Sequence, residues 1–232
     1  MAPTFSVVVP VYNEADFIPT ALPMLVAEME TLDVRYEILI VENGSDDGTA
    51  DVARSIASES VLVLSLSRPD YGSAMHHGFS KATGDWVVNF DIDYFSANFL
   101  NKVLGIGDAD LVIASKRDPE SEDRRPLMRR LATRVFNLLL RGILNSGVSD
   151  THGMKAFRKE LITDLNDTVV SRQDLFDTEL VIRAERAGYK IVEVPVVIEE
   201  MRTARSSLIK RVPRTVRGLF RIRKRLKDPT GE

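Results

Sequence analysis

The sequence predicts an α/β protein whose mostly parallel sheet is flanked by helices, and two observations carry this prediction. Strand and helix signals alternate through the first half of the 232-residue chain, as in consecutive βαβ units. Polar, turn-forming residues follow several predicted strands, at the edge where open parallel sheets bind ligands. We expect one large domain over residues 1–205 and a separate basic, amphipathic tail over residues 206–232.

Apolar periodicity places the individual elements. Buried or β-branched runs predict strands over residues 5–11, 37–41, 61–67, 86–90, 111–115, 154–158 and 190–198. Helices are predicted over residues 16–32, 49–58, 72–83, 124–144 and 174–188. In the helix 124–144 the periodic apolar positions are Leu127, Leu131, Val135, Leu138 and Leu139. Its arginines are expected on a solvated face or on a phosphate-facing surface.

Composition excludes several kinds of site. The chain has no cysteine, so it contains no disulfide, thiolate zinc site or cysteine nucleophile. This composition suits a reducing compartment. We see no secretory signal at the N-terminus and no run approaching the roughly 18 apolar residues of a membrane span. These observations favour a cytoplasmic protein.

The charge of the chain is divided between an acidic domain and a basic tail. Eleven of the 31 Lys and Arg residues lie between positions 202 and 227, where there is no Asp or Glu; the remaining 20 face 34 acidic residues elsewhere. Apolar residues recur near helical spacing in this tail: Val212, Val216, Leu219, Phe220 and Leu226. The pattern is typical of a helix on an anionic membrane surface, and a solvated tail is the alternative. Nucleic acid is not expected as a partner, because Phe220 is the only aromatic residue available for stacking.

Asp91 and Asp93 follow the predicted strand 86–90 and are the strongest candidates for a metal site. Carboxylates at positions i and i+2 beyond a strand end can converge on one divalent cation. A cation held there could bridge a diphosphate and neutralise it as it leaves. The Gly-rich fingerprints of dinucleotide dehydrogenases and P-loop enzymes are absent, so a nucleotide whose diphosphate is held by a metal fits better.

Several motifs in order along the chain resemble the family 2 glycosyltransferases. They lie at residues 5–14, 41–49 and 72–93, and this family has the GT-A fold, a Rossmann-like arrangement for nucleotide-diphospho-sugar transfer. Residues 176–180 and 188–196 resemble the branch that transfers sugars to dolichol or polyprenyl phosphate. The likeness covers about residues 5–207.

The resemblance implies roles for individual residues. Those implied for nucleotide-sugar binding are Pro10, Tyr12, Glu14, Glu42, Asn43, Arg68, Gly72, Asp91 and Ile92. Asp91 and Asp93 would hold Mg²⁺ or Mn²⁺ against the donor diphosphate. Those implied for the acceptor or the phosphates are Arg117, Arg130, Arg134, His152 and Arg202.

The resemblance also implies an activity: inverting transfer of one sugar from GDP-mannose or a UDP-hexose to a polyprenyl or dolichyl phosphate. The enzyme would reach this lipid at the inner membrane face through its tail or through a membrane-protein partner. A lipid phosphate is already anionic and needs no general base. A soluble or polysaccharide hydroxyl acceptor would need one, and Asp177 or Glu179 is the best candidate.

Two departures from the family pattern keep a further alternative open. Glu42 and Asn43 stand where the family usually has two aspartates. Phe95 stands where some relatives carry a polar residue that helps to bind the metal. A catalytically silent nucleotide-sugar-binding homologue is therefore the other reading of the sequence.

Overall fold

The computed structural model describes residues 4–172, 175–198, 202 and 208–227. A seven-stranded sheet in the order β3-β2-β1-β4-β7-β5-β8 forms its centre. The strands are β1 (Phe5–Val11), β2 (Tyr36–Asn43), β3 (Val61–Leu66), β4 (Trp86–Asn89), β5 (Leu111–Ser115), β7 (Lys155–Arg158) and β8 (Ile191–Pro195). Only β7 runs antiparallel to its neighbours, so the prediction of a mostly parallel sheet is confirmed.

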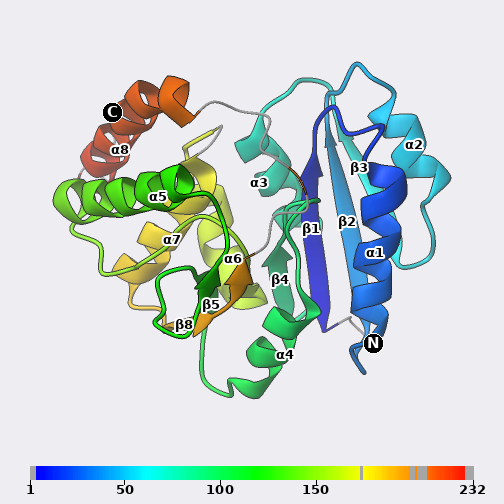
Figure 1. Ribbon diagram of the computed structural model, residues 1–232, viewed down its shortest axis with the longest axis horizontal. Coiled ribbons are helices and arrows are strands. Elements are labelled where there is room, and N and C mark those ends of the chain that lie inside the picture. Colours follow the sequence, from blue (N-terminus) through cyan, green and yellow to red (C-terminus); the bar gives the residue numbers. More distant parts are fainter. Residues whose placement is uncertain (1–3, 173–174, 199–201, 203–207, 228–232) are drawn as a thin grey trace.

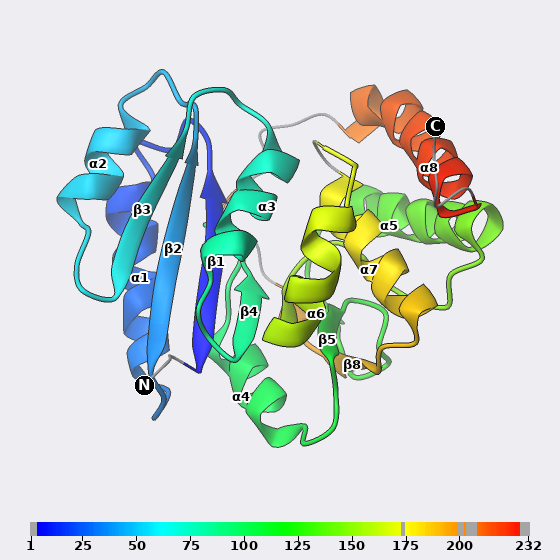
Figure 2. The same cartoon turned by 180° about the vertical axis from the view of Figure 1, so that it is seen from behind.

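Helices cover both faces of the sheet (Figures 1 and 2). One apolar cluster joins the sheet to α1 (Ile18–Glu30), α2 (Thr49–Ser55) and α4 (Ala97–Gly105). A second cluster joins the opposite face to α3 (Tyr71–Lys81), α6 (Lys159–Leu165) and α7 (Phe176–Ala187). A short 3₁₀ turn, η2 (Asn166–Thr168), follows α6.

A third layer packs outside α7. It consists of α5 (Leu127–Leu139), its π-helical continuation η1 (Leu140–Leu144), and α8 (Leu208–Lys227). Leu140, Leu144, Leu219 and Ile222 meet Ile182 of α7 in a small separate core. The basic tail is therefore docked on the protein, and part of the apolar face assigned to a membrane contacts the domain instead. The division into a domain of residues 1–205 and a tail of residues 206–232 remains a prediction.

The second half departs most from the predicted elements. Helices α4 and α6 were not predicted. The strand expected over residues 190–198 is divided into β8 and β9 (Val197–Ile198), and β9 pairs with the short strand β6 (Glu122–Asp123). The helix expected from residue 124 begins only at Leu127, because Pro126 occupies the position before its first turn.

Helix α5 turns its apolar stripe outward. Leu127, Met128, Leu131 and Leu138 are 76, 70, 52 and 68% exposed, and Val135 is 47% exposed. The residues of α5 and η1 that pack inward lie on the opposite side of the helix. Arg134 and Arg141 are exposed as well, so apolar side chains and arginines share the solvent-facing surface of this helix.

Close packing fixes α3 above the strands that carry the predicted site. A Cβ atom added at Gly78 would lie 2.4 Å from Cγ1 of Val8 in β1 and 2.9 Å from Cγ2 of Val41 in β2. Glycine lets the helix approach the sheet at this point. The N-terminus of α3 is thereby held beside the carboxyl ends of β1 and β2.

Candidate active site

The loops that follow β1 and β2 are joined into one polar edge. The backbone N–H groups of Asn13 and Glu14 donate to the hydroxyls of Ser45 and Thr49 at 3.0 and 2.7 Å. The side-chain oxygen of Asn13 accepts from the backbone N–H of Asp46 at 3.2 Å. The two loops therefore support each other at the sheet edge where the sequence predicted a nucleotide.

Other residues expected to contact the nucleotide lie along the same edge. Tyr12 is 45% exposed, and Arg68, just after β3, is also exposed. Pro10 is half-buried near the end of β1, and Gly72 is buried in the first turn of α3. The exposed Tyr12 ring offers a surface on which a base could stack.

Glu42 and Asn43, the two departures from the family pattern, are both buried and both hold backbone. The Glu42 carboxylate accepts from the backbone N–H of Ser45 at 2.5 Å and so closes its own turn. The Asn43 side chain accepts from the backbone N–H of Asp70 at 2.8 Å. Asp70 in turn caps α3 by accepting from the N–H of Ser73 at 2.9 Å. Although Glu42 and Asn43 depart from the family pattern, both side chains therefore hold the backbone at this edge of the sheet in place.

Asp91 and Asp93 flank a buried residue in a tight turn. The backbones of Asp91 and Tyr94 exchange hydrogen bonds at 3.0 and 3.3 Å, and the side chain of Ile92 points into the core, 4% exposed. Burial, and then the negative charges of Asp93 and Asp177, raise the pKa of Asp91 to about 6. The turn thus concentrates more negative charge than its surroundings neutralise.

A cationic side chain already lies against this charge. The guanidinium of Arg202 donates two hydrogen bonds to the Glu14 carboxylate, both at 2.5 Å, and one to Asp93 at 2.9 Å. It also stacks 4.3 Å above the ring of Phe17. Glu14 and Asp93 hold its proton more firmly, so the pKa of Arg202 is raised. Arg202 links the end of β1 to the aspartate turn.

The residues at the turn fit a divalent cation only in part. Within the described residues, no group of three or more His, Cys, Asp or Glu side chains is arranged to hold a metal. Asp91 and Asp93 could offer two carboxylates. Mg²⁺ is commonly bound by one or two carboxylates together with substrate phosphates and water, so two protein ligands are compatible with such a site.

A second polar cluster lies beside the turn, under the N-terminus of α7. Asp177 is 6% exposed and accepts a hydrogen bond at 2.9 Å from the hydroxyl of Tyr71. The ammonium of Lys155, which is fully buried, lies 3.2 Å from the same carboxylate oxygen. Burial and then the charge of Asp177 raise the pKa of Tyr71, so it remains a hydrogen-bond donor. Asp177 and Lys155 therefore form a buried ion pair.

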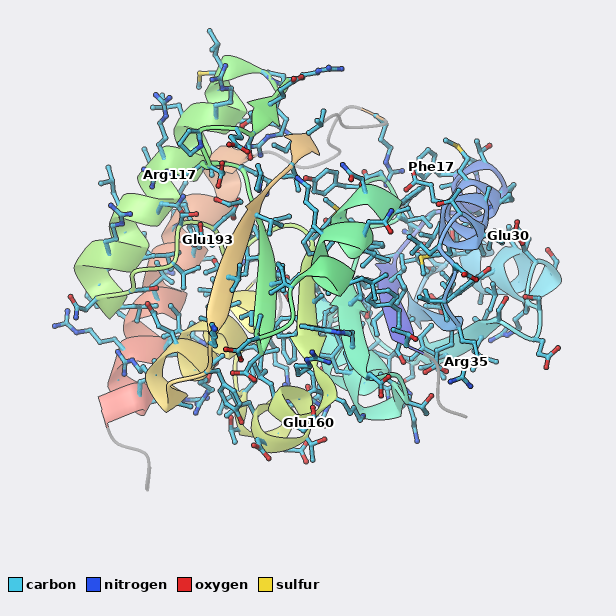
Figure 3. All side chains as sticks on the ribbon, turned by 90° about the horizontal axis from the view of Figure 1, so that it is seen from below. Phe17, Glu30, Arg35, Arg117, Glu160 and Glu193 are labelled. Atoms are coloured by element: carbon cyan, nitrogen blue, oxygen red, sulfur yellow. The ribbon has the colours of Figure 1, made fainter. Side chains whose placement is uncertain are left out.

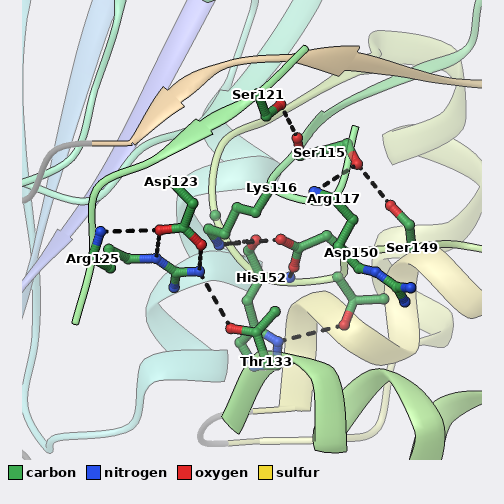
Figure 4. A network of polar contacts seen from close by, with 12 residues as sticks. Ser115, Lys116, Arg117, Ser121, Asp123, Arg125, Thr133, Ser149, Asp150 and His152 are labelled. Atoms are coloured by element: carbon green, nitrogen blue, oxygen red, sulfur yellow. Dashed lines mark hydrogen bonds and ion pairs between the residues drawn. The ribbon is translucent and has the colours of Figure 1, made fainter. Parts of the chain in front are cut away.

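A second lysine enters the site from the end of β5 (Figure 4). Lys116 lies 3.3 Å from the Asp150 carboxylate and donates to the carbonyl oxygen of His152 at 2.8 Å. Burial lowers the pKa of Lys116, and the charge of Asp150 opposes that shift. The imidazole of His152 meets the Phe136 ring of α5 edge-on, with centroids 4.6 Å apart. Burial of the imidazole lowers the pKa of His152.

Asp123 of β6 and Arg125 form an ion pair beside Lys116 (Figure 4). Arg125 donates to both oxygens of Asp123, at 2.8 and 2.7 Å. Both side chains are only about one-tenth exposed. Burial opposes ionisation of Asp123, but the hydrogen bonds from Arg125 outweigh it and lower the pKa of that carboxyl. The pair fixes the chain between β6 and α5.

Glu179, predicted as a possible general base, holds backbone instead. Its carboxylate is fully buried and accepts from the backbone N–H groups of Val170 and Ser171 at 3.3 and 2.7 Å. It also receives two hydrogen bonds from Arg183 at 2.9 and 2.6 Å. A carboxylate with four donors and no exposed surface is badly placed to take a proton from an acceptor. Of the two predicted bases, only Asp177 borders the site.

The remaining predicted cations are spread over the protein. Arg117 is exposed after β5, on the opposite side of the molecule from Phe17, which marks the Arg202 contact (Figure 3). Arg130 is half-buried and Arg134 exposed, both on α5. The structure brings only Arg202, from this group, into contact with the aspartate turn.

With this geometry established, comparison with known proteins identifies the chain. The model of the family described as "Glycosyl transferase family 2" matches residues 6–165, which is more than half of the sequence. The chain belongs to glycosyltransferase family 2. The resemblance of its motifs is therefore confirmed, and the protein is a glycosyltransferase.

Relatives of this family 2 enzyme share its sequence over most of its length. Glycosyltransferase AglD of Haloferax volcanii is 32% identical over 201 residues, which are 82% of this chain but only 32% of AglD. "Uncharacterized glycosyltransferase Mb0553" of Mycobacterium bovis is 35% identical over 194 residues, covering 82% of this chain and 83% of that protein. The chain spans about a third of AglD but most of Mb0553.

Solved structures confirm the GT-A fold of this family 2 enzyme. Mannosyl-3-phosphoglycerate synthase from Rubrobacter xylanophilus superimposes with a TM-score of 0.69 at 22% identity, over 99% of this chain and 76% of that one. Glucosyl-3-phosphoglycerate synthase from Mycobacterium tuberculosis, solved with Mn²⁺, UDP and product, gives 0.67 at 22% identity, over 95% and 78%.

Sequence reasoning missed three residues of the site in this family 2 enzyme: Tyr71, Lys116 and Lys155. The position of Lys155 within a predicted strand was a signal, because a lysine at a buried strand position needs a partner. Nothing in the sequence joined it to Asp177, which lies 22 residues further along.

Proposed function

We propose that this glycosyltransferase moves one sugar, with inversion, from a nucleoside diphosphate sugar to a polyprenyl phosphate at a membrane surface. The pairing of Asp177 with Lys155 carries the proposal. A general base needs a free lone pair directed at the acceptor hydroxyl, whereas Oδ2 of Asp177 is already engaged by the Tyr71 hydroxyl and the Lys155 ammonium. A phosphate acceptor needs no such base, and the cations around Asp177 suit its charge.

Mg²⁺ or Mn²⁺ held by Asp91 and Asp93 would neutralise the diphosphate that leaves; Mn²⁺ accompanies UDP in the mycobacterial synthase. The polar edge formed by the loops after β1 and β2 would orient the nucleoside. Arg202 reaches this edge and the aspartate turn together, so it can contact a phosphate placed between them. Positioning and charge stabilisation of this kind typically supply several kcal/mol.

The outward stripe of α5 supports contact with a membrane. Leu127, Leu131 and Leu138 are exposed, and arginines of this helix and of η1 flank them: Arg130, Arg134 and Arg141. From residue 127 to residue 144 there is no acidic residue. Exposed apolar side chains bordered by cations fit an anionic lipid surface, where each Lys or Arg contributes about 1 kcal/mol. No helix in the described part of the chain is long and apolar enough to cross a membrane.

Helix α8 adds to this charge. It has no acidic residue along its length, and it exposes Val212 and Phe220, each 53% exposed, together with arginines. Figures 1 and 2 show α8 beside α5 at the end of the molecule away from α1 and α2. We propose that these two helices make a peripheral contact with the inner face of the membrane, with or without a membrane-protein partner.

The decisive experiment measures transfer of labelled sugar from GDP-mannose and, separately, from UDP-glucose into organic-extractable lipid. The assay contains polyprenyl phosphate and Mn²⁺, with Asp93→Ala as the inactive control. Label in the lipid from one donor supports the proposal. No label with polyprenyl phosphate, but transfer to a soluble acceptor, would overturn the lipid assignment.

A second candidate is transfer to a soluble phosphorylated hydroxyl acceptor. Two structural neighbours are named for 3-phosphoglycerate, which favours an anionic acceptor of this kind. The assay therefore includes 3-phosphoglycerate. In that reaction Asp177 would be the base, and Asp177→Asn would abolish transfer while leaving donor binding intact.

Vesicle binding tests the membrane contact separately. The full chain should sediment with vesicles of phosphatidylglycerol and phosphatidylcholine, more weakly as salt rises, and weakly with phosphatidylcholine alone. Leu131→Gln/Leu138→Gln should lose most of this binding without losing stability, because both side chains are exposed. Equal sedimentation of this variant and the wild type would exclude α5 from the contact.

A further inference from the structure

The two carboxylates in the first turn of α7 are engaged very differently. Both oxygens of Glu179 are occupied, Oε1 by Arg183 and Oε2 by the backbone N–H of Ser171. In Asp177 only Oδ2 has a hydrogen-bond or ion-pair partner within the described part of the chain. A carboxylate that only holds the fold is expected to use both oxygens, as Glu179 does. The second oxygen of Asp177, Oδ1, is therefore available to a ligand.

Partners from three elements hold Oδ2 of Asp177 in place. The Tyr71 hydroxyl of α3 donates to it at 2.9 Å, and the Lys155 ammonium of β7 lies 3.2 Å away. Asn89, the last residue of β4, donates to the Tyr71 hydroxyl at 3.4 Å. Lys155 also donates to the carbonyl oxygen of Gly153 at 2.5 Å. These contacts fix the orientation of the carboxylate, so Oδ1 has a defined position.

Oδ1 of Asp177 is also accessible. Asp177 is not among the described side chains that contain a buried polar atom without a hydrogen-bond partner, which are Tyr94, Asn137, Asp150 and Asn166. Its side chain keeps 8% of its surface exposed, although its partner Lys155 is fully buried. An ionised carboxylate oxygen can only accept hydrogen bonds. The site therefore presents one accessible, anionic acceptor that needs a donor.

The aspartate turn indicates which part of the substrate lies beside Asp177. The negative charge of Asp177 acts on the Asp91 carboxylate, so the two residues are neighbours. A diphosphate bound at Asp91 and Asp93 would therefore place the sugar that it carries near Asp177.

Two other partners for Oδ1 suit it less well than a sugar. The described residues contain no group of three His, Cys, Asp or Glu side chains arranged for a metal, so Asp177 does not complete a metal site with Asp91 and Asp93. An anionic acceptor would be repelled by a carboxylate oxygen. A sugar hydroxyl is neutral and can donate a hydrogen bond to it.

We propose that Oδ1 of Asp177 accepts a hydrogen bond from one hydroxyl of the transferred hexose and so selects the sugar. This rests on the proposed function, in which the acceptor is a phosphate and Asp177 is not a general base. Tyr71 and Lys155 are positioning residues, because they act on the sugar only through Asp177. A site built to bond a hydroxyl discriminates strongly against a sugar that lacks it, since the carboxylate oxygen is then left unpaired.

Calorimetric titration with donors, in Mn²⁺ and without any acceptor, tests this contact. UDP-glucose and GDP-mannose are compared with their analogues that lack the hydroxyl at C2, C3, C4 or C6, and with UDP and GDP. In the wild type, one analogue should bind at least about tenfold more weakly than the complete donor, as expected for a hydrogen bond to a charged group. In Asp177→Asn this ratio should fall to about threefold or less, because the amide is neutral, while the Kd of the nucleotide alone changes less than about twofold.

The matched control is Asp167→Asn. Asp167 is an exposed carboxylate on η2 that pairs with His76, and its variant should keep the wild-type ratio. Unchanged donor affinity in Asp177→Asn would overturn the proposal and would fit a general base instead. Equal weakening of the nucleotide and the complete donor would also overturn it, because the sugar would then play no part.

A second variant covers the case in which Asp177→Asn does not fold. Tyr71→Phe keeps the ion pair with Lys155 but removes one of the two contacts that orient the carboxylate, so the ratio should fall at least about threefold. An unchanged ratio in Tyr71→Phe, or a wild type that binds every analogue as tightly as the complete donor, would overturn the proposal. Transfer to polyprenyl phosphate is measured separately, so a failure of the lipid assignment is distinguished from a failure of this contact.

Discussion

Replacing Arg202 with glutamine should tighten the binding of Mn²⁺ in the absence of donor. Arg202 donates to Asp93 at 2.9 Å, so a cation bound by Asp91 and Asp93 must displace this contact and tolerate a like charge close by. Glutamine removes the competing charge and leaves the carboxylates in place. The substitution therefore acts on the metal site without removing a metal ligand.

The structure gives the size of this effect. Two unit charges about 4 Å apart interact by about 4 kcal/mol at an effective dielectric constant near 20. The side chains of Arg202 and Asp93 are 20 and 31% exposed, and screening by solvent reduces this to about 1 kcal/mol. A difference of about 1 kcal/mol corresponds to roughly a fivefold lower Kd for Mn²⁺.

The assay is a titration of free Mn²⁺ followed by electron paramagnetic resonance. Arg217→Gln is the control, because it removes the same charge from an exposed position on α8. We expect unchanged affinity in that control and no binding in Asp91→Ala/Asp93→Ala. Sugar transfer by Arg202→Gln should fall even though the metal binds more tightly, since the contact to donor phosphate is lost. Unchanged or weaker Mn²⁺ binding in Arg202→Gln would refute the competition.

Three further predictions concern stability, measured by urea unfolding. Lys155→Met should lower the free energy of unfolding by about 3–5 kcal/mol, because it leaves Asp177 buried without its cation; an equally stable variant would contradict the pairing. Asp123→Asn should destabilise the protein at pH 7 by about 1–3 kcal/mol. The folded pKa of Asp123 lies below its ordinary value of 3.8 because Arg125 outweighs burial, so its stabilisation is present above about pH 4 and lost as the pH falls through the folded pKa. The difference from the wild type should therefore shrink in acid, and a constant difference would refute the ion pair. Gly84→Ala should cost about 1–3 kcal/mol, because its Cβ would lie 2.8 Å from a backbone nitrogen of β1; no loss would mean that the strand yields.

Much of the first half could be predicted because its signals are local. Strand 5–11 matches β1 to the residue, and the polar residues at the ends of β1, β2 and β4 lie along one edge of the sheet. The carboxyl ends of parallel strands lie at the same edge of a sheet, whichever side chains they carry. The second half was harder, since the antiparallel strand β7 is inserted between β4 and β5 from a distant part of the chain.

The candidate site, too, could be predicted only in part. The Asp91-Ile92-Asp93 turn could be found from sequence, because its two carboxylates and the buried residue between them are neighbours in the chain. The partners of Asp177 could not, since Tyr71 and Lys155 come from other elements. Glu179 shows the limit of motif reasoning: two residues from Asp177, it points away from the site because a helix turns by about 100° per residue.

By itself the sequence determined the family, the α/β class and the pair of aspartates, because each of these depends on local pattern and on motifs in order. Only the tertiary structure decided which side of an amphipathic helix is buried. Periodicity shows that α5 and α8 each have an apolar stripe, but it does not say what covers it. In α5 the stripe faces outward, whereas Leu219 and Ile222 of α8 face the protein. That choice depends on which apolar surfaces the rest of the fold leaves open, and so on contacts between residues that are far apart in the chain.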